Sequence, residues 1–597
     1  MNRRRFLKQL TGLTGGLALA RLAAPASSPP LTSSGQPRPQ ESAGHETLYN
    51  GIRLPDPWPP RYPPEDFRTP VAPPYLADIP EVIPIDRGRQ LFVDDFLISE
   101  STLKRSFHRA RLHPENPVLK PETPLEMNRG LQPVACPFND GVFYDPEDRL
   151  FKMWYHAGWF DGIAYATSRD GIHWTRPRLD VEPGTNRVLV RGKGYERDGV
   201  GIWLDQETSD RQQRFKMFAF FRGPDNFRRG EVYTSADGIH WGEPTPTGPC
   251  GDNTTFFYNP FRKVWVYSIR TFQFQPRLSR LRGYREHPDF AEGAAWEESD
   301  VHHWAGADEL DPPAPDLGHP TQLYNVDAAG YESLMIGLLA IHRGPPNQIC
   351  LEGGFPKLTE LCLGFSRDGF HWHRPDRRSF IAPSRRKGTW NRAYLHSAGG
   401  CCLVVGDQLY FYFGAWSGES PKLGGHMYAG GSTGLAVLRR DGFASLDAPA
   451  SGGAVTTRPL RFQGRHLFVN LQAPRGRLQA EVLDAQGVPI APFSRQNCLP
   501  VSGDSTLSQV AWRDAADLSR LAGRPVRFRF HLTNGKLYSF WVSPSQTGAS
   551  NGYLAGGGPG FTGPSDTVGE PRDEGQWRDQ PTATRWSTHR ISSRLTS

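Results

Sequence analysis

The 597-residue sequence lacks the features that define several large classes of protein. Its seven cysteines are odd in number and irregularly spaced, so they indicate neither a disulfide framework nor a zinc-binding motif. The adjacent residues Cys401 and Cys402 lie in the apolar segment AGGCCLVV, where we expect small core residues on opposite faces of a strand.

The chain also lacks the basic excess of a nucleic-acid-binding protein. Its formal net charge is +7, but five unopposed basic residues lie within the first 26 positions. These residues are Arg3, Arg4, Arg5, Lys8 and Arg21. The rest of the chain is nearly balanced in charge, so we expect no nucleic-acid partner.

Residues 1–26 predict an export signal. A basic cluster precedes a short apolar, glycine-rich run, and Ala24-Pro25-Ala26 supplies small residues for cleavage. The segment Arg3-Arg4-Arg5-Phe6-Leu7-Lys8 resembles a twin-arginine signal, which implies the twin-arginine export machinery as a partner and a periplasmic or secreted bacterial location. The alternatives are an ordinary secretory signal or a short anchor. Because the apolar run is too short to span a bilayer comfortably, we expect no stable membrane insertion after signal removal.

What the sequence does contain is a repeat. SRDGIHW at 168–174 recurs as SADGIHW at 235–241 and SRDGFHW at 366–372, with weaker copies near Trp296 and Leu446. Each copy follows a β-rich run and supplies Asp-Gly turn chemistry before an aromatic position. The copies recur at intervals of 52 to 79 residues, which indicates consecutive small antiparallel sheets. We therefore predict an all-β protein built on a five-bladed β-propeller.

The domain boundaries follow from the strand pattern. Five strand–turn–strand segments place the propeller at residues 83–448, and alternating strands at 449–543 predict a β-sandwich. The proline-rich residues 27–82 read as a linker or surface arm. The Gly-, Pro- and Ser-rich residues 544–597 are expected to be largely disordered or draped over the surface.

The repeat separates structural acids from candidate functional ones. Asp170, Asp237 and Asp368 recur at the corner turn, so we interpret them as turn-forming residues. The same reasoning applies to four residues that we place at the hairpin turn of successive units, Asp145, Asp205, Asn259 and Asp327.

Acids that break the repeat are the candidates for chemistry. Asp140, Asp198 and Asp252 each precede or begin the inner strand of one of the first three units. Inner strands of a propeller converge on one mouth of a central channel, so these carboxyls are expected to lie close together. The alternative is that they only close Asp-Gly and Gly-Asp turns.

Glu332 is the single residue that we favour most as a catalytic acid. It lies in the apolar segment GYESLMIGLL, where the first two units carry Lys152 and Lys216 in the equivalent position. A desolvated carboxyl has a raised pKa, which suits a general acid near neutral pH. The alternative is a buried acid paired with a structural arginine such as Arg343 or Arg270.

Further polar residues are candidates for lining a substrate pocket. They are Asn139, Arg129, His156, Arg270, His396 and Glu360. Asp94 and Asp95 in the predicted strand QLFVDDFLI either face the channel or protect an edge strand.

The repeated Ser-x-Asp-Gly-x-x-Trp corners on five β-rich units resemble the five-bladed glycosidase propellers of glycoside hydrolase families 32, 43, 68 and 130. A sandwich directly after the propeller is similar to the layout of family 32. The resemblance covers about residues 83–543 and implies a glycosidase-type activity. Only Asn139-Asp140 resembles the nucleophile motif of family 32, Arg197-Asp198-Gly199 is the nearest match to its Arg-Asp-Pro motif, and Glu332 is a stand-in for its acid. Fructoside specificity is therefore not carried over.

Together these features predict an exported glycoside hydrolase acting on a poly- or oligosaccharide. Glu332 would protonate the leaving oxygen, Asp140 or Asp198 would act as nucleophile or activate water, and a third acid such as Asp252 would stabilise charge. This chemistry requires no metal and no organic cofactor. The alternatives are a non-catalytic carbohydrate-binding propeller and a glycoside phosphorylase; a six-bladed sialidase fits less well because five units are counted.

Overall fold

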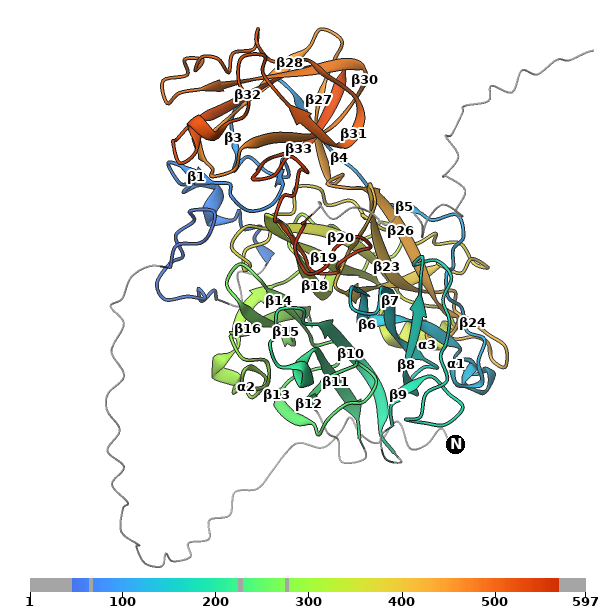
Figure 1. The fold of residues 1–597 in the computed structure, drawn as a ribbon. Helices are drawn as coiled ribbons and strands as arrows, with labels where there is room; N and C mark the ends of the chain where they lie inside the picture. Colours follow the sequence, from blue (N-terminus) through green and yellow to red (C-terminus); the bar gives the residue numbers. More distant parts are fainter. Residues whose placement is uncertain are drawn as a thin grey trace, which may run out of the picture. The chain divides into compact units, whose positions relative to one another are not determined.

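The computed structural model describes residues 46–63, 68–190, 192, 194–223, 229–273 and 279–567. The predicted signal at 1–26 and part of the predicted arm at 27–82 lie outside these residues. The regular secondary structure of the described chain is almost entirely β-strand (Figure 1). Its helices are short: α1 (Pro124–Met127), α2 (Phe290–Ala294) and α3 (Asn347–Gly353). Within the described ranges no helix has the length and apolarity needed to cross a membrane.

Three sheets are built from strands that are consecutive in the sequence. The first has the order β10 (Glu196–Leu204), β11 (Phe215–Arg222), β12 (Arg229–Ser235) and β13 (Thr245–Pro249). The second has the order β14 (Thr255–Asn259), β15 (Val264–Gln273), β16 (Ser279–His287) and β17 (His302–Ala305). The third contains β18 (Gln322–Glu332), β19 (Leu334–Gly344) and β20 (Leu358–Ser366), and β34 (Tyr553–Leu554) joins it beside β18.

A nine-stranded sheet combines the first and fifth predicted units. It contains β6 (Val134–Asp145), β7 (Leu150–Ala157), β8 (Gly162–Ser168), β9 (Arg187–Leu189), β21 (Ala393–Gly399), β22 (Leu403–Val405), β23 (Gln408–Trp416), β26 (Gly431–Arg439) and β5 (Arg111–Leu112). A separate pair, β24 (Glu419–Ser420) and β25 (Gly424–Gly425), lies between β23 and β26 in the sequence. The parallel pairing of β6 with β21 joins the two units.

The inner strands of the five units lie side by side in a closed series. β10 contacts β6 and β14, β18 contacts β14 and β21, and β21 pairs with β6. The prediction of an all-β fold with propeller-type sheets is confirmed. The count of five separate blades stays a prediction, because the first and fifth units share one sheet.

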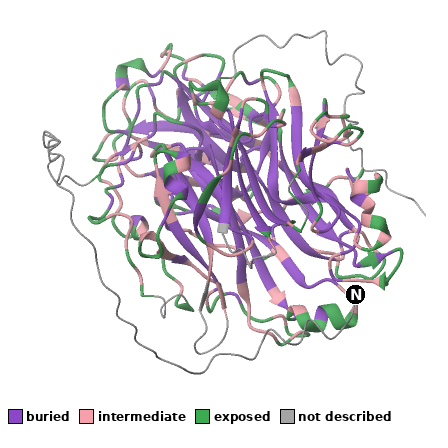
Figure 2. Ribbon diagram, turned by 90° about the horizontal axis from the view of Figure 1, so that it is seen from below, coloured by how far each residue is buried: buried purple, intermediate pink, exposed green. Residues whose placement is uncertain are grey.

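The inner strands are buried on both faces. Every residue of β6 is buried, and so is every residue of β18 after Gln322. Figure 2 shows this burial along the central strands, with most exposed residues in the loops and helices at the periphery. A strand buried on both faces loses the apolar–polar alternation of a half-exposed strand. Polar side chains within these strands therefore need partners inside the protein.

The C-terminal domain is a second nine-stranded sheet. Its main path runs through β3 (Ile98–Ser101), β28 (Gly453–Thr457), β32 (Arg527–Thr533), β30 (His466–Leu483), β33 (Gly535–Ser543), β27 (Ala444–Ala448) and β4 (Lys104–Phe107), with β2 (Gln90–Leu91) and β31 (Val501–Val510) attached. The 18-residue β30 pairs with β31, β32 and β33, so one sheet folds around a single apolar core that includes Phe462, Phe528 and Phe540.

The segment that begins at residue 83, which we expected to open the propeller, pairs with the C-terminal domain instead. β2, β3 and β4 pair with C-terminal strands, and β1 (Ile83–Pro84) pairs with β29 (Leu460–Arg461). The predicted strand QLFVDDFLI is interrupted, because Asp94 accepts a hydrogen bond from the backbone N–H of Phe96 (3.1 Å) and closes a turn. Asp94 also pairs with Arg367 (2.8 Å) and is not channel-facing.

The prediction of a disordered tail from residue 544 is wrong for residues 544–567. β34 pairs with the end of β18, and Asp566 is fully buried. The glycines that suggested disorder instead allow close packing: a Cβ on Gly552 would lie 2.7 Å from the Cα atoms of Glu332 and Gly88. Residues 568–597 lie outside the described part of the chain.

The repeated corners form the same local structure each time. In the third copy, Asp368 Oδ1 accepts from the backbone N–H groups of Phe370 (2.9 Å) and His371 (2.8 Å), and Oδ2 contacts the His371 ring (2.6 Å). Asp170 and Asp237 accept from the equivalent backbone groups. These aspartates therefore form turns, as their recurrence predicts.

The corners differ in burial, which predicts a difference in stability. The side chain of Asp368 is 4% exposed and that of Asp237 is 48% exposed. Asp368→Ala leaves buried N–H groups without an acceptor, so we expect it to lower the free energy of unfolding by about 1–3 kcal/mol more than Asp237→Ala. Urea denaturation of the two variants measures this difference. Equal losses would contradict the explanation.

Candidate functional site

The candidate site lies where the inner strands begin. Arg197 and Asp198 lie at the start of β10, Asp252 precedes β14, and Tyr324 and Tyr394 lie near the starts of β18 and β21. β6 reaches the same region through an irregular segment between Cys136 and Gly141. A bulge of this kind redirects side chains, and Asn139 within it has a φ of +70°.

Asp140 is a fully buried carboxyl in that irregular segment. Oδ2 accepts from the backbone N–H of Phe138 (2.7 Å), and Oδ1 accepts from the guanidinium of Arg197. Burial raises the pKa of Asp140 to about 6, although Arg197 opposes the rise. Arg197 is also buried, and its Nε and Nη1 atoms have no hydrogen-bond partner among the described residues. A cavity of about 200 Å³ beside Arg197 is lined partly by Phe160, Tyr195 and Phe221.

Asp198 and Asp252 share one guanidinium. Arg222 donates from Nε to Asp198 Oδ2 (2.6 Å) and from Nη2 to Asp252 Oδ2 (2.8 Å). Arg270 forms a further ion pair with Asp252. The structure therefore brings Asp198 and Asp252 together with Arg222 and Arg270, whereas Asp140 pairs with Arg197, the residue before Asp198 on β10.

Asp327 is a site residue that the sequence reasoning assigned to a turn. It lies inside β18 rather than at the hairpin, which closes between Tyr331 and Leu334. Its Oδ2 accepts from Asn139 Nδ2 (2.7 Å) and from Ser397 Oγ (2.6 Å). Burial raises the pKa of this carboxyl, and those hydrogen bonds oppose the rise. The long apolar run on either side of Asp327 was the signal that could have identified it.

Glu332 occupies the turn position that we had given to Asp327. It ends β18 with a φ of +52° and is fully buried. It lies five positions after Asp327 along the strand, a distance of roughly 16 Å at about 3.3 Å per residue. Glu332 therefore does not share a site with Asp140, Asp198 and Asp252, and its assignment as the general acid is corrected.

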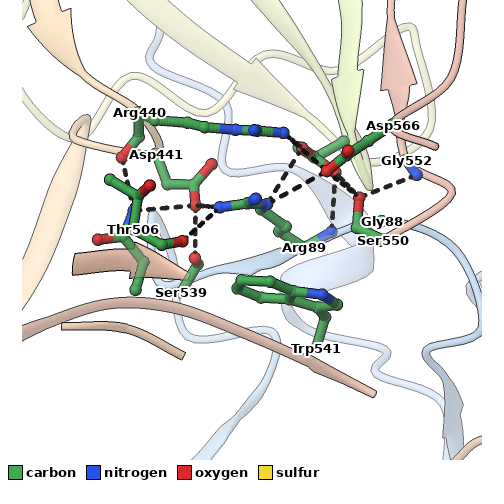
Figure 3. Close-up of polar contacts among 12 residues, drawn as sticks. Gly88, Arg89, Arg440, Asp441, Thr506, Ser539, Trp541, Ser550, Gly552 and Asp566 are labelled. Carbon is green, nitrogen blue, oxygen red and sulfur yellow. Dashed lines mark hydrogen bonds and ion pairs between the residues drawn. The ribbon is translucent and has the colours of Figure 1, made fainter. Parts of the chain in front are cut away.

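The partners of Glu332 come from three separate chain segments. Oε2 accepts from the backbone N–H of Arg89 (3.1 Å) and from Ser550 Oγ (2.6 Å), and Oε1 accepts from Arg440 (3.1 Å). Asp566 accepts from the same two side chains, Arg440 (2.7 Å) and Ser550 (2.9 Å). Figure 3 shows the network around Arg89, which also packs on the Trp541 ring at 4.1 Å. The reading of Glu332 as a buried acid held by structural arginines is the one that fits, although the arginines are Arg89 and Arg440.

The remaining predicted residues divide into two groups. The first group contacts residues of the site: Asn139 binds Asp327, and Arg270 pairs with Asp252. His396 packs on Phe138 (4.0 Å between ring centres), and His156 stacks on Trp159 (4.9 Å). Burial lowers the pKa of both histidines well below the ordinary value, so they are neutral. Arg129 is exposed in the turn Asn128–Gly130, and Glu360 pairs with Arg343 (2.7 Å).

A buried lysine and its tyrosines complete the site. Lys357 is fully buried; its Nζ donates to the Tyr324 hydroxyl (2.9 Å) and lies 4.5 Å from the Tyr394 ring. The Tyr324 and Tyr394 hydroxyls are 3.1 Å apart. Burial alone would raise the pKa of Tyr324, but Lys357, Arg280 and Arg270 outweigh it and lower the pKa to about 7. Sequence reasoning missed Lys357 because it lies in the loop before β20, far from its partners in the chain.

An aromatic surface adjoins these groups. Trp159 stacks on Tyr428 with ring centres 4.1 Å apart and planes 8° apart, and Arg222 lies over the Phe160 ring at 5.1 Å. Within the described ranges, no cluster of histidine, cysteine or acidic side chains is arranged to hold a metal ion. The arrangement supplies carboxyls, cations and aromatic faces in one place.

The position of Glu332 predicts a pH-dependent contribution to stability. Burial, followed by the neighbouring charge of Asp566, raises the pKa of Glu332 from 4.5 to about 7. The folded protein therefore holds a proton that the unfolded chain releases, so this contribution decreases as the pH rises from about 4.5 to 7. In Glu332→Gln we expect a flatter pH dependence of the free energy of unfolding across that range. Denaturant titrations at several pH values test this against Glu309→Gln, a change at an exposed acid; identical pH profiles for wild type and Glu332→Gln would contradict it.

Comparison with known proteins gives low similarity throughout. No family model matches the chain, and no curated protein matches it. Among solved structures, an N-acetylgalactosamine deacetylase from F. plautii in complex with blood group B trisaccharide is 13% identical, with 59% of this chain and 95% of that chain covered and a TM-score of 0.36. A β-fructofuranosidase from Schwanniomyces occidentalis is 12% identical, with 72% and 97% covered and a TM-score of 0.33. A third structure comes from the GH130 family of mannoside phosphorylases, which contains glycoside hydrolases that target β-1,2 mannosidic linkages in Candida mannan. It is 14% identical, with 56% of this chain and 94% of that chain covered and a TM-score of 0.36.

Proposed function

We propose that this protein cleaves a glycosidic bond at the end of the propeller where the inner strands begin. The observation that carries this proposal is a pair of carboxyls in different environments. Asp140 is buried and has a pKa of about 6, whereas Asp198 is held against the Arg222 guanidinium (2.6 Å). Two carboxyls whose environments differ in this way are suited to an acid role and a charged role.

The roles follow from this difference. Asp140 takes the acid role that Glu332 loses: its protonated form donates to the leaving oxygen. Asp198 acts as the carboxylate that attacks the anomeric carbon or activates water. Asp252, which contacts the same Arg222 guanidinium (2.8 Å), stabilises the positive charge that develops on the sugar. The rings of Phe160 and Tyr428 provide apolar faces on which a sugar stacks.

A non-catalytic carbohydrate-binding protein is the second candidate. It is favoured by one observation: both oxygens of Asp140 already accept hydrogen bonds, from Arg197 and from Phe138 N–H. A glycoside phosphorylase is distinguished by its co-substrate, inorganic phosphate.

Substitution of the two carboxyls tests the catalytic proposal. We expect Asp140→Asn and Asp198→Asn each to lower kcat by about 10²–10⁴ on an unactivated oligosaccharide. An aryl glycoside with a good leaving group needs no proton from the acid, so Asp140→Asn retains most activity on it and Asp198→Asn does not. Activity should fall as the pH rises through about 6, because Asp140 then loses its proton.

Asp237→Asn, at an exposed corner, is the matched control and keeps wild-type activity. Wild-type rates for Asp140→Asn on both substrates, or binding of glycans without any cleavage, would reject the catalytic proposal. Formation of a sugar phosphate only when inorganic phosphate is present would assign the phosphorylase reaction.

Export is part of the same proposal. Residues 1–26 would direct the folded protein through the twin-arginine machinery to the periplasm or the medium. Replacement of Arg3, Arg4 and Arg5 by lysine should leave the protein in the cytoplasm, as measured by cell fractionation. Unchanged export of this variant would favour the ordinary secretory route.

A further inference from the structure

Five cationic side chains gather at the candidate site. Arg222 ends β11, Arg270 lies on β15, Arg280 and Arg282 lie on β16, and Lys357 precedes β20. Arg222 and Arg270 pair with Asp198 and Asp252. In the part of the chain that the structure describes, Arg280, Arg282 and Lys357 have no carboxylate within ion-pair distance.

The register of the sheet brings two of these cations directly opposite each other. Arg270 pairs across the strands with Arg282, and Arg280 lies two residues from Arg282 on the same face of β16. Like charges in directly opposite positions of an antiparallel pair destabilise a sheet.

The hydrogen bonds of the unpaired cations are to neutral groups. Arg282 is fully buried and donates to the carbonyl oxygens of Asn253 (2.7 Å) and Tyr324. Arg280 donates to Gln322 Oε1 (2.6 Å) and lies over the Tyr324 ring at 5.2 Å. Lys357 donates to Tyr324 and to Asn347 Oδ1 (3.1 Å). Carbonyl and amide oxygens satisfy the donors but do not neutralise the charges.

The ionisation of neighbouring groups reflects this excess of positive charge. Burial and the charges of Arg270 and Arg280 lower the pKa of Arg282 to about 9, and burial followed by the charge of Arg280 lowers that of Arg270 to about 10. The same cations favour the anionic form of Tyr324. Desolvated charges are costly unless an opposite charge accompanies them. The cations of the site therefore outnumber the carboxylates that pair with them, which leaves positive charge for a further anion to neutralise.

We propose that this anion belongs to the substrate: the site binds a sugar that carries a carboxylate, as a uronic acid does, between Arg280, Arg270 and Tyr324. The inference rests on the proposed function, because it specifies the substrate class of the same site. A guanidinium matches a carboxylate with two parallel hydrogen bonds, and Arg280 Nε has no partner in the described chain. The aromatic rings lie next to this cluster, because Lys357 Nζ is 5.8 Å from the centre of the Tyr428 ring and Arg222 lies over the Phe160 ring at 5.1 Å. Inorganic phosphate carries the same type of charge, so the experiment includes it separately.

Binding measurements with a matched pair of ligands test the proposal without requiring turnover. By calorimetry, methyl glucuronoside should bind the full-length protein at least about tenfold more tightly than methyl glucoside, which is about 1.4 kcal/mol. The preference should decrease with added salt, because part of it is electrostatic. It should fall to near unity in Arg280→Gln and persist in Arg211→Gln, a change at an exposed arginine that pairs with Glu147 at a distant hairpin.

A second measurement follows the ionisation of Tyr324 in the wild-type protein. The negative charge of bound methyl glucuronoside should move the tyrosinate titration of Tyr324 upward from about pH 7, and Tyr324→Phe identifies the signal by ultraviolet difference spectroscopy. At equal saturation, methyl glucoside should produce a smaller shift.

The outcomes separate this inference from the proposed function. Equal binding of the two glycosides, or equal shifts of the titration, overturns the acidic-sugar inference even if neutral glycosides are cleaved. Preferential binding of the glucuronoside without cleavage of any glycoside supports it and rejects the catalytic proposal. Tight binding of inorganic phosphate that the glucuronoside does not compete away assigns the anion to phosphate and overturns the inference.

Discussion

A charge that is removed from water has to be matched by an opposite charge, and this constraint governs both ends of the inner strands. At one end, Arg89 and Arg440 are buried with Glu332, Asp441 and Asp566 (Figure 3). Breaking one member of such a network costs about 3–5 kcal/mol, because it leaves an uncompensated buried charge. The network joins the segment before the C-terminal sheet, the β18 hairpin, the end of β26 and the chain near Asp566, so it fixes these segments together.

At the other end the same constraint is not met by the protein alone. Arg282 and Lys357 are as deeply buried as Arg89, yet their partners are carbonyl, amide and hydroxyl oxygens. The carboxylates that are present, Asp198 and Asp252, already share Arg222 and Arg270. The network around Glu332 contains its own opposite charges and holds the structure together. The cations at the other end lack them, which is why we propose that end as the ligand site.

Sequence reasoning succeeded where the determinants are local. The corner turns depend on residues within three positions of each aspartate, so their recurrence was sufficient to predict the turns and the all-β fold. It failed for Glu332 and Asp327, because the turn of the β18–β19 hairpin lies between Tyr331 and Leu334 and not at Asp327. The partners of Glu332 also lie far away in the chain: Arg89 is 243 positions before it and Ser550 is 218 positions after it.

Composition misled for a related reason. The glycine-rich segment near residue 552 was predicted to be disordered from its composition. Because Gly552 has no side chain, however, the backbone can approach Glu332 closely. Lys357 carried no signal, because a single lysine in a loop is ordinarily exposed. Of the acids predicted before the inner strands, Asp198 and Asp252 share Arg222, whereas Asp140 pairs with Arg197. Their grouping in one catalytic site stays a prediction, which depends on a general property of propellers, the convergence of inner strands, and not on any particular partner.

β18 connects the two ends of the domain. Tyr324 contributes to the cationic site, Asp327 binds Asn139 and Ser397 in the middle, and Glu332 closes the network with the C-terminal domain. The segments from Tyr324 to Asp327 and from Asp327 to Glu332 span roughly 10 Å and 16 Å at about 3.3 Å per residue. The network around Glu332 is neutralised within itself, so it presents little net charge to the cationic site across this distance. The residues that stabilise the two domains can therefore change without altering the chemistry of the site, whereas Asp327, which connects β6, β18 and β21, cannot be exchanged without affecting the positions of both Asn139 and Ser397.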